Sequence, residues 1–173
     1  MKIELKRIEF SERLSEETNA FTADIWCDGK KVGICKNDGR GGCTDYYGFE
    51  KYHSDDIKRM EDYCKTLPPI VYTQENEGFD MTLDMNLEHY IDNLFEDWLK
   101  EKENKKLLKK MEKGLLISKN PKFTYSIITW KNQTIEGMLR NTVLTASLKQ
   151  TIKKYRGEGY TIMNTNIPDE ILN

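Results

Sequence analysis

The sequence predicts an α+β protein: an N-terminal antiparallel sheet packed with helices, one long amphipathic helix, and further strands and a helix in the C-terminal half. Three observations support this. Apolar and polar residues alternate through the first 35 or so positions, a helical apolar stripe runs from about 86 to 112, and strand-like runs flank another helical stripe after it. A length of 173 residues fits one domain, 1–173, with 1–72 and 84–173 as candidate subdomains.

The first strand is expected at about 3–10 and contains an irregularity. Its apolar side chains alternate with polar ones, but the phase of the alternation reverses across Lys6-Arg7. Such a reversal is typical of a β-bulge, so we expect a bulge at this point.

The second and third strands form a predicted hairpin. Alternating residues lead into Asp28-Gly29, which is a signal for a two-residue turn of type I′. A regular ladder counted from this turn pairs Ile25 with Val32 and places Cys27 and Cys35 on opposite faces of the sheet. These two cysteines are then expected neither to bond to each other nor to share a metal ion.

The long helix has the strongest periodic pattern in the chain. Asn86 is a good capping residue, apolar positions recur at helical spacing from Leu87 to Met111, and Gly114 ends the helix. At 1.5 Å per residue such a helix spans about 40 Å. Acids gather in its first half and lysines in its second, which indicates either a docking surface or a solvated face that complements the helix dipole.

The remaining elements are shorter. A helix is expected from Ser54 to the Leu67-Pro68-Pro69 stop, and 70–72 is an extended segment. After the long helix we expect strands at 115–118, 123–130 and 160–163, and a helix at 142–156.

Bulk charge and hydropathy exclude some classes of function. The chain has 27 basic and 29 acidic residues, and a net charge of −2 gives no general attraction to nucleic acid or to anionic membranes. No apolar run reaches the length of a signal peptide or a membrane span. We therefore expect a cytoplasmic protein without a membrane partner, whose four cysteines are reduced thiols.

The glycine-rich loop 37–48 is the candidate functional site, because it holds four of the eleven glycines together with polar and aromatic side chains. In one interpretation its freed backbone amides cradle an anion while an arginine and a tyrosine add contacts. In the other it is a wide turn in which side chains cap the backbone and glycines take positive φ. The candidate ligand- or partner-contacting residues are Asn37, Asp38, Gly39, Arg40, Gly41, Gly42, Thr44, Asp45, Tyr46 and Tyr47.

Recognised signatures of catalysis or metal binding are not found in the sequence. The loop lacks the lysine and hydroxyl of a phosphate-binding loop, and Cys35, Cys43, His53 and Cys64 lack the close Cys-x-x-Cys pairs of structural zinc sites. No metal or cofactor is therefore predicted, and a non-enzymatic protein is favoured over an enzyme.

Two alternatives stay open. One is a small hydrolase or nucleotide-processing enzyme that uses Asp38, Asp45 and His53. The other is an oligomer in which apolar residues of the long helix meet a second copy. Those residues are Leu94, Trp98, Leu107 and Leu108.

Three strings carry a family resemblance: Asn37-Asp38-Gly39-Arg40-Gly41-Gly42-Cys43-Thr44-Asp45-Tyr46, the preceding segment 14–21, and 63–68. They resemble a set of small uncharacterised proteins of bacteriophages and prophages, as does the C-terminal segment 163–168. The resemblance implies no activity and no catalytic residues. It implies a context in which small accessory proteins bind and block a host component, such as a defence protein or its nucleotide signal.

We therefore hypothesise a non-enzymatic phage or prophage accessory protein. Its loop 37–48 is expected to bind a host protein or a small anionic ligand. A role against a host defence follows only from the resemblance.

Overall fold

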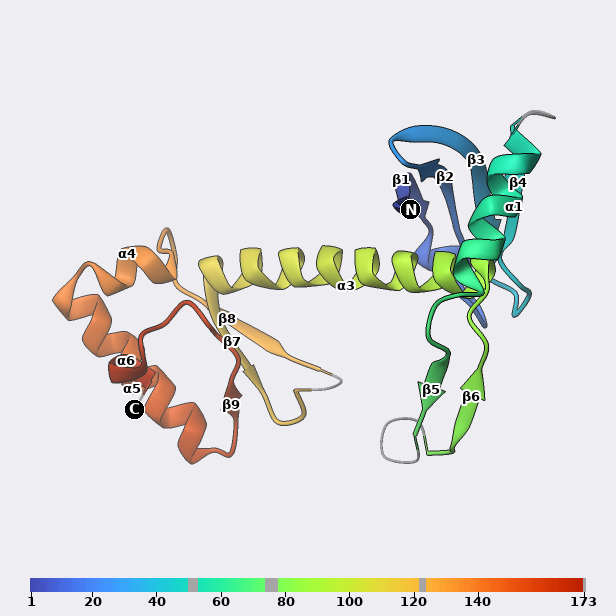
Figure 1. The fold of residues 1–173 in the computed structure, drawn as a ribbon. Helices are drawn as coiled ribbons and strands as arrows, with labels where there is room; N and C mark the ends of the chain where they lie inside the picture. Colours follow the sequence, from blue (N-terminus) through green and yellow to red (C-terminus); the bar gives the residue numbers. More distant parts are fainter. Residues whose placement is uncertain (50–52, 74–77, 122–123, 173) are drawn as a thin grey trace. The chain divides into compact units, whose positions relative to one another are not determined.

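The computed structural model describes residues 1–49, 53–73, 78–121 and 124–172 (Figure 1). The chain divides into two compact units, Met1–Leu99 and Lys100–Asn173, and the boundary lies inside the long helix. The secondary structure confirms the predicted α+β class, with antiparallel sheets and helices along the chain.

A four-stranded antiparallel sheet forms the centre of the first unit, in the order β1 (Ile3–Phe10), β2 (Phe21–Cys27), β3 (Lys30–Asn37), β4 (Asp45–Gly48). The expected bulge in β1 is confirmed: the register with β2 shifts between Lys6 and Glu9. Both residues of the Asp28-Gly29 turn have positive φ, 48° and 85°, as a type I′ turn requires.

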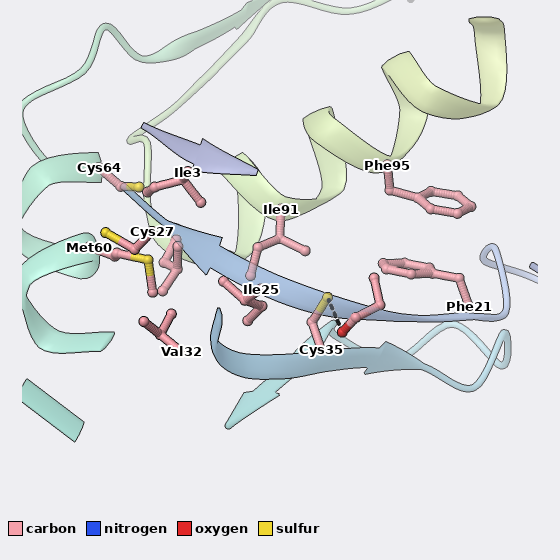
Figure 2. Close-up of a cluster of buried hydrophobic side chains, with 12 residues drawn as sticks. Ile3, Phe21, Ile25, Cys27, Val32, Cys35, Met60, Cys64, Ile91 and Phe95 are labelled. Carbon is pink, nitrogen blue, oxygen red and sulfur yellow. Dashed lines mark hydrogen bonds between the residues drawn. The ribbon is translucent and has the colours of Figure 1, made fainter. Parts of the chain in front are cut away.

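The register of this hairpin corrects the expected one. The two pairs next to the turn match a regular ladder, but a bulge then shifts the pairing, so that Ile25 lies opposite Gly33 instead of Val32. The predicted placement of Cys27 and Cys35 on opposite faces is wrong. Both thiols are buried on the inner face, as Figure 2 shows.

Two helices pack against the inner face of the sheet: α1 (His53–Cys64) and the first turns of α3 (Leu87–Lys113) (Figure 2). Phe21 of β2 and Phe95 of α3 stack with ring centroids 3.9 Å apart. The buried residues of this core are Ile3, Phe21, Ala23, Ile25, Cys27, Val32, Cys35, Met60, Cys64, Leu87, Ile91 and Phe95. The long helix thus begins where predicted, and the Asn86 side chain accepts the His89 amide at its start.

Leu94 and Trp98, which the oligomer alternative assigns to a contact with a second copy, pack at the edge of this core. Their apolar surface is therefore partly used inside the first unit. The unit also contains the short 3₁₀ helix η1 (Glu12–Leu14) and an antiparallel pair of strands, β5 (Ile70–Tyr72) and β6 (Met81–Leu83). The second strand of that pair was not expected from the sequence.

The second unit is built around β7 (Gly114–Ser118), which lies between β8 (Ser126–Thr129) and β9 (Thr161–Ile162). Its helices are α4 (Ile135–Leu139), α5 (Thr142–Gly157) and α6 (Asp169–Leu172). All five residues of β7 are buried, and the core continues through Ile135, Met138, Leu148, Ile152 and Ile167.

A buried amide ties the end of α3 to β7 within the second unit. Asn164, 5% exposed, donates from Nδ2 to the carbonyl oxygens of Met111 and Gly114 and accepts the Leu116 amide at 2.7 Å. The neighbouring Asn166 also donates to the Met111 carbonyl. The Met111 carbonyl, which both side chains satisfy, is one of those that a helix end leaves without an intrahelical partner.

Among the described residues, no helix combines the length and apolar character needed to cross a lipid bilayer.

Candidate functional site

The backbone of the glycine-rich loop follows the turn interpretation. Gly39 and Gly41 have φ of 84° and 83°, in the left-handed region that glycine adopts without strain. The Asn37 carboxamide oxygen accepts the Gly39 amide at 2.9 Å, and the Asp38 carboxylate accepts the Arg40 amide at 3.2 Å. The first half of the loop is therefore two successive side-chain-capped turns.

Backbone hydrogen bonds hold this loop against the segment between β1 and β2, and this contact is called the clasp below. The carbonyl oxygen of Gly39 accepts the amides of three successive residues, Glu16, Glu17 and Thr18. A Cβ at position 39 would lie 2.3 Å from the Leu14 carbonyl oxygen, so only glycine fits this close approach. Two segments that the sequence analysis treated separately thus form one surface.

A second set of hydrogen bonds fixes the other end of the loop. Asn37 Nδ2 donates to the Gly42 carbonyl and to the Thr44 hydroxyl, both at 3.1 Å. Thr44 is 3% exposed and donates to the Asp92 carboxylate of α3 at 2.6 Å, while its amide donates to Glu88. Asn37, Gly39 and Thr44, three of the predicted contact residues, therefore hold the loop in place.

The Asp92 carboxylate lies in an unfavourable environment for its charge. Burial, followed by the repulsion of Glu88 and Glu96, raises its pKa, while the hydrogen bond from Thr44 lowers it. This carboxylate and Glu88 are the parts of the loop's anchor that the sequence analysis missed. The only signal for them is their spacing of four on one helix face, which is common on any helix.

Most of the backbone amides that would have to cradle an anion already donate hydrogen bonds within the protein. The amides of Gly39, Arg40, Gly41 and Thr44 all donate to side chains within the first unit. Carboxylates also surround the loop, since Glu17 lies against Gly41 and the α3 acids lie beneath Thr44. The exposed residues that remain for a ligand or partner are Asp38, Arg40, Gly41, Gly42, Asp45 and Tyr47.

Asp38 and Arg40 lie on the rim of a pocket of about 610 Å³. Its lining includes the apolar side chains of Phe10, Phe21 and the 58%-exposed Leu14, together with polar and charged residues. The described residues that line it are Glu9, Phe10, Ser11, Leu14, Glu16, Ala20, Phe21, Thr22, Asn37, Asp38 and Arg40. Residues of the 37–40 turn and of the segment between β1 and β2 thus line the same pocket.

The two tyrosines of the loop belong to a different surface. Tyr46 and Tyr47 line a hollow of about 530 Å³ between β4 and α1. The Tyr46 hydroxyl donates to Glu61 at 2.9 Å, and burial followed by this carboxylate raises the pKa of Tyr46 to about 12. The structure therefore does not bring the tyrosines to the pocket that Asp38 and Arg40 line.

The residues of the enzyme alternative are spread over the first unit. Asp38 lines the pocket, whereas Asp45 lies on β4 opposite Lys36 and is 3.9 Å from its ammonium group. His53 begins α1, and its side chain lies outside the part of the chain that the structure describes. Within the described residues, no group of three or more His, Cys, Asp and Glu side chains is arranged to hold a metal ion.

The four cysteines are unpaired thiols, and Cys43 alone is exposed. Its hydrogen bond to Glu88 raises the pKa of the Cys43 thiol, so that the reactive thiolate is disfavoured. Burial raises the pKa of Cys35 to about 12 and that of Cys64 to about 11. These thiols lack the lowered pKa that marks a nucleophilic cysteine.

Comparisons with protein-family models, with curated proteins and with solved structures gave no significant match for this chain.

Proposed function

We propose that this protein is a non-enzymatic binding protein whose 37–48 loop contacts a partner protein. In the phage setting that the sequence resemblance implies, the partner is a host protein. The observation that carries the proposal is the pocket beside the 37–40 turn, with its apolar lining and charged rim. Its volume of about 610 Å³ is within the roughly 300–1,000 Å³ of ordinary ligand pockets.

The charges on the rim favour one kind of partner over another. The described lining residues include three carboxylates, those of Glu9, Glu16 and Asp38, and one guanidinium, that of Arg40. A small anion would meet a net negative rim, and four of the loop amides already donate within the protein. A protein segment that inserts an apolar side chain and carries a lysine or arginine beside it fits both the lining and the rim.

The anchoring of the loop supports a role in binding. The turn is clasped at Gly39 and tied to α3 through Thr44. A contact surface held in this way loses little conformational entropy on association, which favours affinity.

Selection from a displayed library of short random peptides, with the full-length protein as bait, tests the proposal. We expect selected peptides to pair a large apolar residue with a nearby Lys or Arg. Asp38→Lys should then raise the Kd of a selected peptide at least tenfold. Glu158→Lys, the same charge reversal at an exposed position in the second unit, is the matched control and should leave the Kd within twofold.

Two results would count against the proposal. One is the absence of enriched peptides. The other is a set of peptides whose affinity falls equally with Asp38→Lys and with Glu158→Lys.

A further inference from the structure

The two units carry opposite charge. Residues 1–99 contain 22 Asp and Glu against 12 Lys and Arg, a formal charge of −10. Residues 100–173 contain 15 Lys and Arg against seven Asp and Glu, a formal charge of +8. The whole-chain value of −2 hides this division. A strong difference in charge between parts of a chain is typical of binding to a polyanion by the basic part.

Three of the basic residues of the second unit line a pocket of about 640 Å³. Lys106 and Lys110 lie four residues apart on one face of α3, and Lys100 lines the same pocket. Glu103 is the single carboxylate among the described residues of the lining. Lys106 is exposed and forms no ion pair with any residue that the structure describes, unlike Lys105, which pairs with Glu101 at 2.7 Å.

An aromatic ring lies in the same pocket. Tyr125 is 41% exposed, and Lys110 Nζ donates to its hydroxyl at 2.5 Å and lies 4.9 Å from the ring centroid. The hydrogen bond from Lys110 fixes the hydroxyl end of the Tyr125 ring and keeps the Lys110 ammonium group close to it. The pocket therefore offers ammonium groups and a partly exposed aromatic surface within reach of one ligand.

We propose that this pocket binds a single strand of nucleic acid, with phosphates at Lys106 and Lys110 and a base against the ring of Tyr125. Sites for single strands combine a basic groove with aromatic side chains on which bases stack. An acidic polypeptide would use the lysines but not the ring, and the favoured ligand is therefore the strand. This inference concerns a second site and does not depend on the peptide pocket of the first unit.

Fluorescence anisotropy of the full-length protein with a fluorescein-labelled 15-nucleotide single strand at 50 mM salt tests the proposal. We expect binding, and at least a tenfold increase in Kd for Lys106→Ala/Lys110→Ala and for Tyr125→Ala. Lys149→Ala/Lys153→Ala removes the same charge from exposed positions of α5 outside the pocket, and should change the Kd less than threefold. Circular dichroism confirms that each variant is folded.

The dependence on salt gives a second readout. Each phosphate contact contributes a slope of about −0.7 to log K against log [salt] for single strands, so the pocket double variant should flatten the slope by about 1.4. Three results would overturn the proposal: no binding at 50 mM salt, equal weakening by the α5 pair, or polyglutamate competing as well as unlabelled strand. The last result would assign the surface to acidic polypeptides.

Discussion

The hydroxyl of Thr44, in the glycine-rich loop, donates a 2.6 Å hydrogen bond to the carboxylate of Asp92 on α3, 48 positions later in the chain. Thr44 is buried and Asp92 is half-buried, and the same hydroxyl accepts a hydrogen bond from Asn37 Nδ2. One buried threonine thus joins the loop to the helix on which it rests. The stability of the loop and of the start of α3 should be coupled through this residue.

Thr44→Val should therefore destabilise the first unit by about 1–3 kcal/mol, because it removes the hydroxyl donor of the Asp92 carboxylate and one of the two hydrogen bonds that Asn37 Nδ2 donates. Urea unfolding monitored by tryptophan fluorescence measures the change, since Trp98 packs beside this core. Thr44→Ser keeps the hydroxyl and should lower the free energy of unfolding much less than Thr44→Val does. Equal losses for Val and Ser would show that packing of the methyl group, not the hydrogen bond, is what matters.

Asp92 should give the first unit an unusual dependence on pH. Its pKa in the folded protein is raised above the ordinary value of 3.8, so the folded state binds the proton at higher pH than the unfolded state does. The contribution of Asp92 to the free energy of unfolding therefore rises as pH falls through the raised pKa. At pH values below the ordinary pKa of 3.8, this gain in the free energy of unfolding is complete.

Asp92→Asn removes this titration while keeping an acceptor for Thr44. At pH 7 it should be at least as stable as the wild type, and its advantage should shrink as pH approaches 4. Urea unfolding of both proteins between pH 4 and 7 measures the difference. An advantage that grows on acidification would show that the carboxylate is stabilised in the fold, contrary to this account.

Gly39 and Gly42 form a matched pair for testing the clasp. Gly39→Ala introduces a Cβ 2.3 Å from the Leu14 carbonyl oxygen at a φ of 84°, so we expect a loss of at least about 2 kcal/mol. Gly42 has no heavy atom within 4 Å of an added Cβ, and Gly42→Ala should change stability by no more than about 0.5 kcal/mol. Thermal unfolding of the two variants distinguishes them. Similar effects at both positions would argue against the clasp.

Asn164→Ala should loosen the junction between α3 and β7 in the second unit. The substitution leaves the Leu116 amide and two backbone carbonyls without their buried partner, for a loss of at least about 2 kcal/mol. Hydrogen–deuterium exchange at the Leu116 amide reports the change directly. Asn166→Ala, which removes one bond to the Met111 carbonyl, is the milder control. Unchanged exchange at Leu116 would contradict the role given to Asn164.

Local patterns in the sequence predicted the parts of the fold that local physics determines. The helix from Leu87 has its cap and its apolar stripe within one segment, and the Asp28-Gly29 turn needs only two residues. The register beyond that turn was predicted wrongly for a clear reason. Val32 with Ile34 and Val32 with Cys35 are both apolar pairs, so the sequence does not reveal which pair points inward.

Contacts between distant segments had no signal in the sequence. The bonds from Gly39 to residues 16–18 and from Thr44 to Asp92 depend on how the chain folds back on itself. The prediction of ten contact residues therefore mixed groups that hold the loop with groups that face solvent. The whole-chain net charge similarly averaged two oppositely charged units, and it gave no indication of the basic surface near Lys106.

The pocket beside the 37–40 turn is proposed to receive an apolar side chain of a partner protein. Leu14 lines this pocket and is 58% exposed, so Leu14→Asp should change the pocket without unfolding the protein. Isothermal titration of a selected peptide into this variant, with its Tm measured alongside, is the most direct test. We expect at least a tenfold weaker Kd at a Tm within about 2 °C of the wild type, an exposed substitution having little effect on stability. An unchanged Kd would contradict the account.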